Sequence, residues 1–177
     1  MYKKYSMISR PQNDIQISTL PSIPGVTIWY CKITSIIQSI FTKSTYHNFQ
    51  PLGNEIFKKD DFKVPFFSDT EIGMINGFKA LKKQMEWISG RYLIKRFIQH
   101  NFSPDLDMDQ ISISYLEQGA PYWTGDPKIP LSLSHSNDYT AVACSADQKQ
   151  TLGLDIEKIA KKQDIYFLRT AFTQDEI

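Results

Sequence analysis

The sequence has 177 residues, of which 41% are hydrophobic and 13% aromatic, and a formal net charge of +1 at pH 7. This composition indicates a folded globular chain, long enough for one domain or two small ones, and excludes an intrinsically disordered protein. A charge so near zero argues against broad electrostatic binding to nucleic acid or to a membrane surface, so any cationic site has to be local.

The two cysteines, Cys31 and Cys144, lie far apart inside apolar, strand-like runs. They form no C-x-x-C or metal-ligand spacing, so we expect buried free thiols, which suit a reducing compartment. No apolar stretch near the N-terminus has the length of a signal peptide, and the longest apolar run, 33–41, is too short to span a bilayer. A cytoplasmic location is therefore expected.

Strand and helix signals follow one another in blocks. Residues 26–33 (VTIWYCKI) are rich in β-branched and aromatic residues and predict a strand. A helical pattern that Gly77 can break runs from about 72 to 100, and its apolar positions recur every three or four residues: Phe78, Leu81, Met85, Ile88 and Tyr92. The later strand candidates are 111–116, 129–134, 140–146 and 151–157. One strand, then helices, then a run of strands predicts an α+β fold.

The chain contains a short internal repeat. Residues 67–72 (FSDTEI) and 172–177 (FTQDEI) share the pattern F-[ST]-x-x-E-I, the form of a capping box that begins a helix. Each follows a strand of the form G-hydrophobic-x-hydrophobic, in 25–29 and 153–157. The repeated order indicates a duplicated unit. Chance recurrence of a common capping motif is the alternative.

The candidate strand 151–157 (TLGLDIE) alternates between apolar and polar positions. Because strand side chains point to alternate faces, Asp155 and Glu157 share one face. Two such carboxylates can hold Mg²⁺, a hard ion that takes oxygen ligands and keeps several waters. An ordinary solvated strand face is the competing interpretation.

His135 lies between two serines in SLSHSNDY (132–139), at the end of a predicted strand. Neighbouring strand residues point to opposite faces, so neither Ser134 nor Ser136 is placed for activation by His135. A phosphate-binding role for the histidine and a hydroxyl is the functional interpretation, and a structural histidine is the alternative.

A basic stripe recurs every four residues along the long helical pattern, so its members line one side. It indicates either a solvated helix face or a local anion site in which an arginine grips phosphate. The stripe consists of Lys79, Lys83, Trp87, Arg91 and Lys95.

Taken together, these stretches resemble the 4′-phosphopantetheinyl transferase superfamily in its larger single-chain type, with two similar halves. The order of the motifs and their gaps carry the resemblance, which covers roughly 73–177. The resemblance implies an α+β fold of two pseudo-symmetric halves, each with an antiparallel sheet and a long helix. Residues 1–148 would form the first half, and 149–177 would begin a second, incomplete half. The matched stretches are SGRYLIKRFI (89–98), QGAPYW (118–123), SLSHSNDYTAVACS (132–145), LGLDIEKI (152–159) and AFTQDEI (171–177).

Members of this family transfer the 4′-phosphopantetheine arm of coenzyme A to a serine of an acyl or peptidyl carrier protein and release adenosine 3′,5′-bisphosphate. The resemblance makes Asp155 and Glu157 the catalytic ligands of a Mg²⁺ that bridges the pyrophosphate, and metal and cations suit such a displacement. It also implies three kinds of contact with coenzyme A. The helix arginine, Arg91, would bind a phosphate, and Gly119 would lie beside the adenosine. Ser132, Ser134 and His135 would hold the phosphate-bearing end of the nucleotide.

The sequence departs from the family pattern in two respects. Ala120 stands where the family often has a lysine or arginine, and the W-x-x-K-E motif, which supplies a further metal-binding glutamate and a lysine, is absent. Neither Trp87 nor Glu176 replaces that motif. We therefore expect Ile177 to be a truncation point. A transferase and a non-catalytic module that binds coenzyme A or a carrier protein both remain open, and a structural interaction domain is a third reading.

Overall fold

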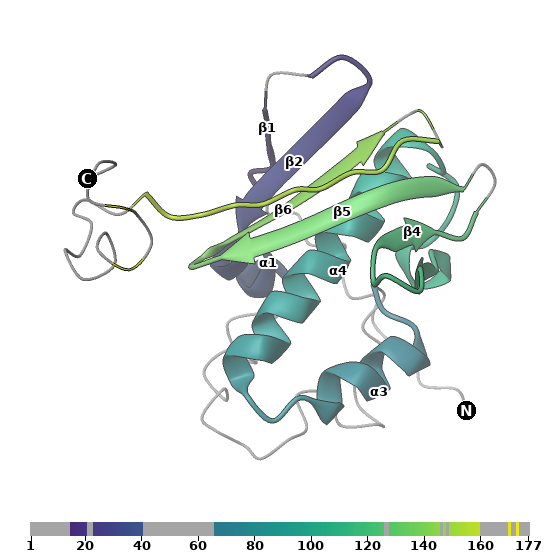
Figure 1. Ribbon diagram of the computed structural model, residues 1–177. Helices are drawn as coiled ribbons and strands as arrows, with labels where there is room; N and C mark the ends of the chain where they lie inside the picture. The colour runs from purple at the N-terminus through teal and green to yellow at the C-terminus, as the bar shows by residue number, and fades with distance from the viewer. Residues whose placement is uncertain are drawn as a thin grey trace, which may run out of the picture.

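The computed structural model describes residues 15–20, 23–40, 66–125, 128–145, 147, 149–159, 170 and 173. This part of the chain forms one six-stranded antiparallel sheet, with the longest helix packed against one face of it (Figure 1). The strand order is β1-β2-β6-β5-β4-β3. The strands are β1 (Ser18–Thr19), β2 (Val26–Lys32), β3 (Ile113–Tyr115), β4 (Pro121–Trp123), β5 (Ile129–Ser136) and β6 (Tyr139–Ser145).

The helices of the described ranges are α1 (Ile33–Ile40), α3 (Asp69–Gly77) and α4 (Leu81–Asn101), followed by the short 3-10 helix η1 (Met108–Gln110). Strands and helices are segregated along the chain, so the predicted α+β class is confirmed. The long helical pattern is divided near Gly77, as its glycine content allowed. Phe78 and Ala80 take extended backbone angles, with ψ of 127° and 123°, and these separate α3 from α4.

The middle of α4 forms the centre of the core. Every residue from Ile88 to Ile98 is buried except Arg96, because the helix is covered by the sheet, by α1 and by α3. A helix enclosed in this way does not need a single apolar stripe. The predicted stripe is accordingly right at Ile88 and wrong at its first turn, where Leu81 is 41% exposed.

Gly90 allows α4 to lie close to the sheet. A Cβ atom at this position would stand 2.8 Å from a terminal methyl of Leu133 in β5, closer than carbon atoms normally approach. Leu131, also in β5, is buried in the same core. Since side chains alternate along a strand, Leu131, Leu133 and His135 face α4, and the intervening serines face the other side of the sheet.

The helix α1 begins directly after β2 and is capped from a distant part of the chain. Thr34 donates from its backbone N and its Oγ1 to the carboxylate of Asp138, at 3.2 and 2.9 Å. The backbone N–H of Ile33 donates to the carbonyl oxygen of Asp138 at 2.8 Å. Asp138 lies in the turn between β5 and β6, so this turn ties the hairpin to the first turn of the helix.

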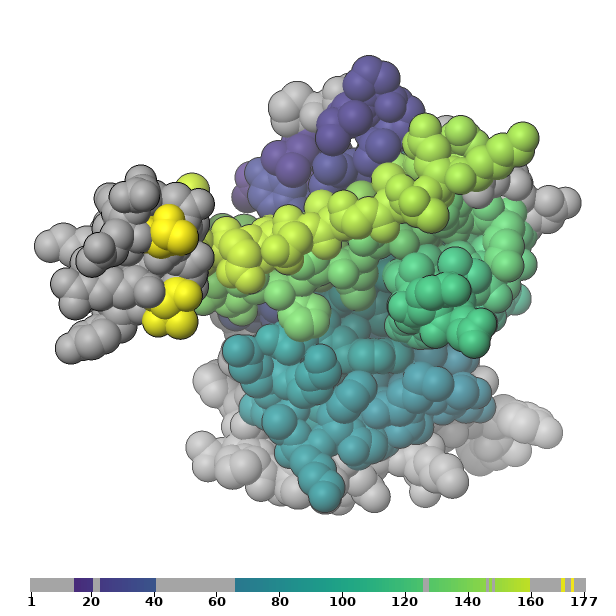
Figure 2. Space-filling model, viewed as in Figure 1, coloured from purple at the N-terminus to yellow at the C-terminus, as the bar shows by residue number. Residues whose placement is uncertain are grey.

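The predicted strand at 151–157 is extended but is not a strand of the sheet. It runs along β5 on the face of the sheet that carries the β5 serines, where Figures 1 and 2 show it as a continuous band. Its expected alternation is confirmed: the apolar side chains at 152, 154 and 156 are half-buried, and Asp155 and Glu157 are exposed.

Several sequence-based expectations concern residues outside the described ranges. They include the irregular connection expected at 42–66, of which only Phe66 is described, and the second capping box at 173–176, of which only Thr173 is described. The second pseudo-symmetric half and the division at residue 148 therefore stay predictions. In the described ranges, no helix has the length and apolar character needed to cross a membrane.

Candidate functional site

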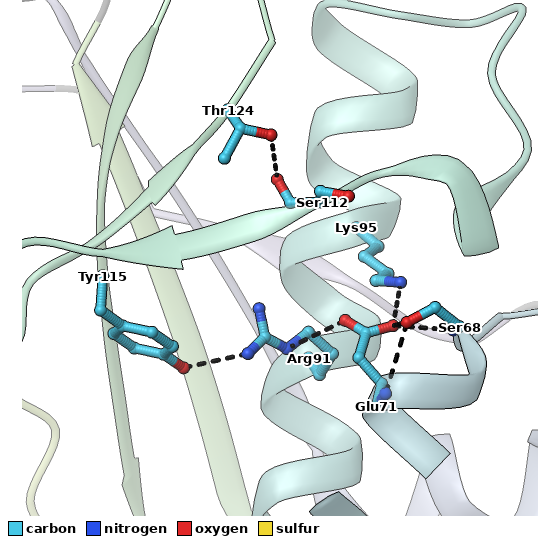
Figure 3. Close-up of polar contacts among 7 residues, drawn as sticks. All are labelled: Ser68, Glu71, Arg91, Lys95, Ser112, Tyr115 and Thr124. Atoms are coloured by element: carbon cyan, nitrogen blue, oxygen red, sulfur yellow. Dashed lines mark hydrogen bonds and ion pairs between the residues drawn. The ribbon is translucent and has the colours of Figure 1, made fainter. Parts of the chain in front are cut away.

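A buried ion cluster joins the start of α3 to the middle of α4 (Figure 3). Glu71 is the capping-box residue of α3: its Oε2 accepts a hydrogen bond from the backbone N of Ser68 at 2.9 Å. The same oxygen accepts from Nζ of Lys95, and the Glu71 Oε1 lies 3.4 Å from Nε of Arg91. One carboxylate thus caps a helix and balances two buried cations.

Arg91 lies between aromatic rings as well as beside Glu71. Its guanidinium carbon is 4.8 Å from the ring centre of Trp87 and 5.6 Å from that of Tyr115. Nη2 donates to the Tyr115 hydroxyl at 3.1 Å, whereas the buried Nη1 has no hydrogen-bond partner among the described residues. Arg91 therefore retains one donor that its surroundings do not satisfy.

The basic stripe on α4 is not a uniformly solvated face. Lys79 and Lys83 are exposed, but Arg91 is only 4% exposed and Lys95 is fully enclosed. Burial lowers the pKa of Lys95 because it disfavours the charged ammonium, and the hydrogen bond that Lys95 donates to Glu71 opposes this shift. The solvated-face interpretation is therefore wrong for the second half of the stripe.

Gly119 lies in the tight turn that joins β3 to β4. Its φ of +85° is a conformation that glycine adopts without the penalty of a Cβ atom. The turn is closed by hydrogen bonds from Gly119 N to the Leu116 carbonyl oxygen and from Leu116 N to that of Ala120. Tyr115 precedes this turn and contacts Arg91, so the hairpin and the guanidinium belong to one neighbourhood.

His135 and its flanking serines lie on opposite faces of β5. The His135 Nδ1 is 3.8 Å from a carboxylate oxygen of Glu86 in α4, an ion pair only when the imidazole is protonated. Ser134 and Ser136 instead bond to the extended segment 151–157 on the other face. This geometry agrees with the expectation that neither serine is activated by His135.

The acidic pair is held against the β5 serines. The Ser134 hydroxyl donates to Asp155 Oδ1 at 3.1 Å, and the Ser136 hydroxyl donates to Glu157 Oε2 at 3.2 Å. Both carboxylates are exposed and lie on the same side of the extended segment. Two solvent-facing carboxylates are a suitable donor set for a hard divalent ion whose remaining ligands are water and phosphate.

The seven predicted site residues fall into two groups. Ser132, Ser134, Asp155 and Glu157 lie on the open face of the sheet, and Arg91, Gly119 and His135 lie on the side of α4 or in the adjacent hairpin. No cluster of three or more potential metal-ligating side chains occurs in the described residues. The D-x-E pair therefore contributes two protein ligands at most, as far as the structure describes the chain.

Three participants were not proposed as site residues from the sequence. Glu71 carried a visible signal as part of a capping box, but its pairing with α4 depends on how the two helices pack. Tyr115 lies inside an ordinary strand pattern, 111–116, and nothing local indicates that its hydroxyl meets Arg91. Ser136 was considered only in relation to His135, because the extended segment that it contacts was expected to be a strand of the sheet.

The cysteines behave as predicted from their apolar surroundings. Cys31 and Cys144 are buried and free, and both lie on the α4 side of the sheet. Burial raises the pKa of each thiol to about 11. These thiols are therefore poor nucleophiles at neutral pH and belong to the core.

Comparison of the sequence with models of known protein families gives no match, and no curated protein matches it either. The described residues define the class of an α+β domain, in which one antiparallel sheet packs against a long buried helix. The particular family indicated by the order of the sequence motifs stays a prediction.

Proposed function

We propose that this chain is a 4′-phosphopantetheinyl transferase, which moves the phosphopantetheine arm of coenzyme A to a serine of an acyl or peptidyl carrier protein. One observation carries the proposal beyond the motifs. The S-H-S stretch and the D-x-E segment, 21 residues apart in the sequence, are hydrogen-bonded side by side through Ser134–Asp155 and Ser136–Glu157. A site for a metal and a phosphate requires these two motifs to meet.

The proposed reaction is a displacement at phosphorus. The carrier serine oxygen attacks the phosphorus that bears the pantetheine arm, and the bond from that phosphorus to the oxygen of adenosine 3′,5′-bisphosphate breaks. The serine proton passes to water, and the adenosine bisphosphate leaves. When bound, Mg²⁺ would supply neutralising charge at the pyrophosphate. Asp155 and Glu157 would hold it, with water and phosphate oxygens completing its shell.

The remaining predicted contacts favour an extended anionic substrate. β4 pairs with β5 only at Pro130 and Ile129, so no described strand covers the outer edge of β5 at the S-H-S stretch. A molecule lying along this edge could reach His135 on one face and Ser134 on the other. Arg91, with one unsatisfied donor, is suited to a phosphate oxygen on the helix side.

Transfer to an apo carrier protein tests the proposal directly. The chain is incubated with coenzyme A, Mg²⁺ and a panel of apo acyl and peptidyl carrier proteins, and the mass of each carrier is measured. The expected result is addition of one phosphopantetheine group, its loss in Asp155→Ala, and its retention in Asp105→Ala, which changes an exposed acid in the turn after α4. Full activity of Asp155→Ala would contradict the metal assignment.

A non-catalytic module that binds coenzyme A or a carrier protein is the second candidate, because the sequence lacks the W-x-x-K-E motif. The two candidates differ in turnover. Calorimetric binding of coenzyme A without transfer to any carrier would favour the module. In either case a reducing cytoplasmic setting is proposed, since both cysteines are buried and unpaired.

A further inference from the structure

The segment at 151–157 lies on the face of the sheet and not at its edge. Backbone hydrogen bonds of a sheet run between strands, roughly in its plane, so the face offers few backbone groups to a segment that lies on it. No backbone–backbone hydrogen bond joins 151–157 to a described strand. An extended segment in this position has to be held by side chains.

The side chains that meet this need are alternate serines of β5. The Ser132 Oγ accepts from the backbone N–H of Leu154 at 2.9 Å, and the Ser134 Oγ accepts from that of Ile156 at 3.2 Å. Both bonds span 22 residues, so β5 and the segment run in parallel with matched spacing. The hydroxyls thereby take the place that carbonyl oxygens would hold in a neighbouring strand.

The hydroxyls of Ser134 and Ser136 also donate to the two carboxylates, each to one of its oxygens. Ser134 donates to Asp155 Oδ1, which additionally accepts from the backbone N–H of Ile156 at 3.0 Å. Ser136 donates to Glu157 Oε2. Among the described residues, these bonds leave Asp155 Oδ2 and Glu157 Oε1 open to solvent and to other ligands.

We propose that Ser132, Ser134 and Ser136 are positioning residues that hold the acidic segment in register on the sheet face. A slip of one residue would turn the carboxylates toward the sheet and the apolar side chains toward water. The serines oppose that slip, and each acid keeps one oxygen fixed and one open. This inference gives the β5 serines a role other than contact with the nucleotide. Its consequence for metal binding rests on the proposed function, whereas the tether itself does not.

Threonine and valine provide a matched test because they are nearly isosteric and differ in the hydroxyl. Backbone amide exchange is measured by NMR in wild type, Ser132→Thr, Ser132→Val, Ser134→Thr and Ser134→Val, with Ser114→Val in β3 as the control. In wild type, the amides of Leu154 and Ile156 are expected to exchange at least about tenfold more slowly than that of Asp155, which has no described acceptor. Ser132→Val should accelerate exchange of the Leu154 amide. Ser134→Val should accelerate exchange of the Ile156 amide by a smaller factor, because that amide also donates to Asp155 Oδ1. The threonine variants and Ser114→Val should resemble wild type.

Mn²⁺ affinity, followed by its electron paramagnetic resonance signal in the same variants, tests the consequence for the acids. Ser134→Val is expected to weaken Mn²⁺ about tenfold and Ser134→Thr to restore it. Unchanged exchange in both valine variants would overturn the tether. If amide exchange became faster in Ser134→Val while its Mn²⁺ affinity stayed unchanged, the proposal that the serines position the two acids would be overturned. Absence of Mn²⁺ binding in wild type would contradict the proposed metal site and the proposal that the serines position its ligands. The amide exchange rates alone would then decide whether the serines hold the segment.

Discussion

Glu71 and Lys95 form a buried ion pair in which the carboxylate that caps α3 also receives the ammonium of α4. The pair joins the start of one helix to the middle of the next, 24 residues further along the chain. Since Lys95 is fully enclosed, its charge depends on this carboxylate for compensation. The arrangement explains how a long basic side chain is accommodated at the centre of the core.

Neutralising Glu71 should therefore destabilise the fold strongly. Glu71→Gln retains an acceptor for the capping box but leaves Lys95 and Arg91 without a counter-charge, and we expect a loss of about 3–5 kcal/mol in the free energy of unfolding. Urea denaturation followed by circular dichroism measures the change. Glu117→Gln, in an exposed turn, is the control and should stay within about 0.5 kcal/mol of wild type. A loss below about 1 kcal/mol in Glu71→Gln would mean that the cluster contributes little.

The distant cap of α1 gives a second prediction. Asp138→Ala removes the acceptor used by Thr34 and should lower the free energy of unfolding by about 0.5–2 kcal/mol. Asp138→Asn keeps a side-chain oxygen and should lose less. Both variants are compared with wild type by urea denaturation. Equal stability of all three proteins would show that the cap is not an energetic link between α1 and the β5–β6 turn.

Thiol reactivity should distinguish the native state from the unfolded chain. The pKa of Cys31 and of Cys144 is raised from 9.0 to about 11, a difference that lowers the thiolate fraction about 100-fold at mildly alkaline pH. Labelling by iodoacetamide, followed by mass spectrometry, should be slower in the native protein by at least this factor, because burial also restricts access. The same reaction in concentrated guanidinium chloride is the reference. Native labelling within a factor of ten of that reference would contradict the burial of these thiols.

The same two pKa values predict how stability changes at high pH. Between about pH 9 and 11 the native state keeps protons that the unfolded thiols have lost. The contribution of the cysteines to the free energy of unfolding is therefore complete below pH 9 and falls as the pH rises toward 11. Urea denaturation of wild type and of the double variant Cys31→Ala, Cys144→Ala across this range isolates the effect. The loss on raising the pH should be smaller in the variant, and equal losses would refute the prediction.

Arg91 allows a prediction about substrate binding, conditional on the proposed function. Arg91→Lys keeps the positive charge beside Glu71 but loses the planar guanidinium with its several N–H donors, and with it the hydrogen bond to Tyr115. We expect KM for coenzyme A to rise about tenfold or more, with kcat changed less, since hydrogen bonds to charged groups contribute about 1.5–3 kcal/mol. Lys83→Met, an exposed position on the same helix, is the control. An unchanged KM in a folded Arg91→Lys would remove Arg91 from the coenzyme A contacts.

Much of the fold could be predicted because its signals are local. The β-branched run of β2, the capping box at Ser68 and the alternation around Asp155 each follow from neighbours within a few residues. The short strands β1 and β4 were not predicted, since two or three residues show no period. The helix α1 was seen only as an apolar run, because its cap comes from Asp138.

By itself, the sequence determined the α+β class, the break near Gly77, the opposite orientation of His135 and its serines, and the common face of Asp155 and Glu157. Backbone geometry and residue periodicity are sufficient for each of these. Only the tertiary structure decided that Lys95 is buried in an ion pair with Glu71. It also decided that the acidic segment runs along β5 on the face of the sheet, where serine hydroxyls hold it. Both depend on packing between segments more than 20 residues apart, which no local pattern contains.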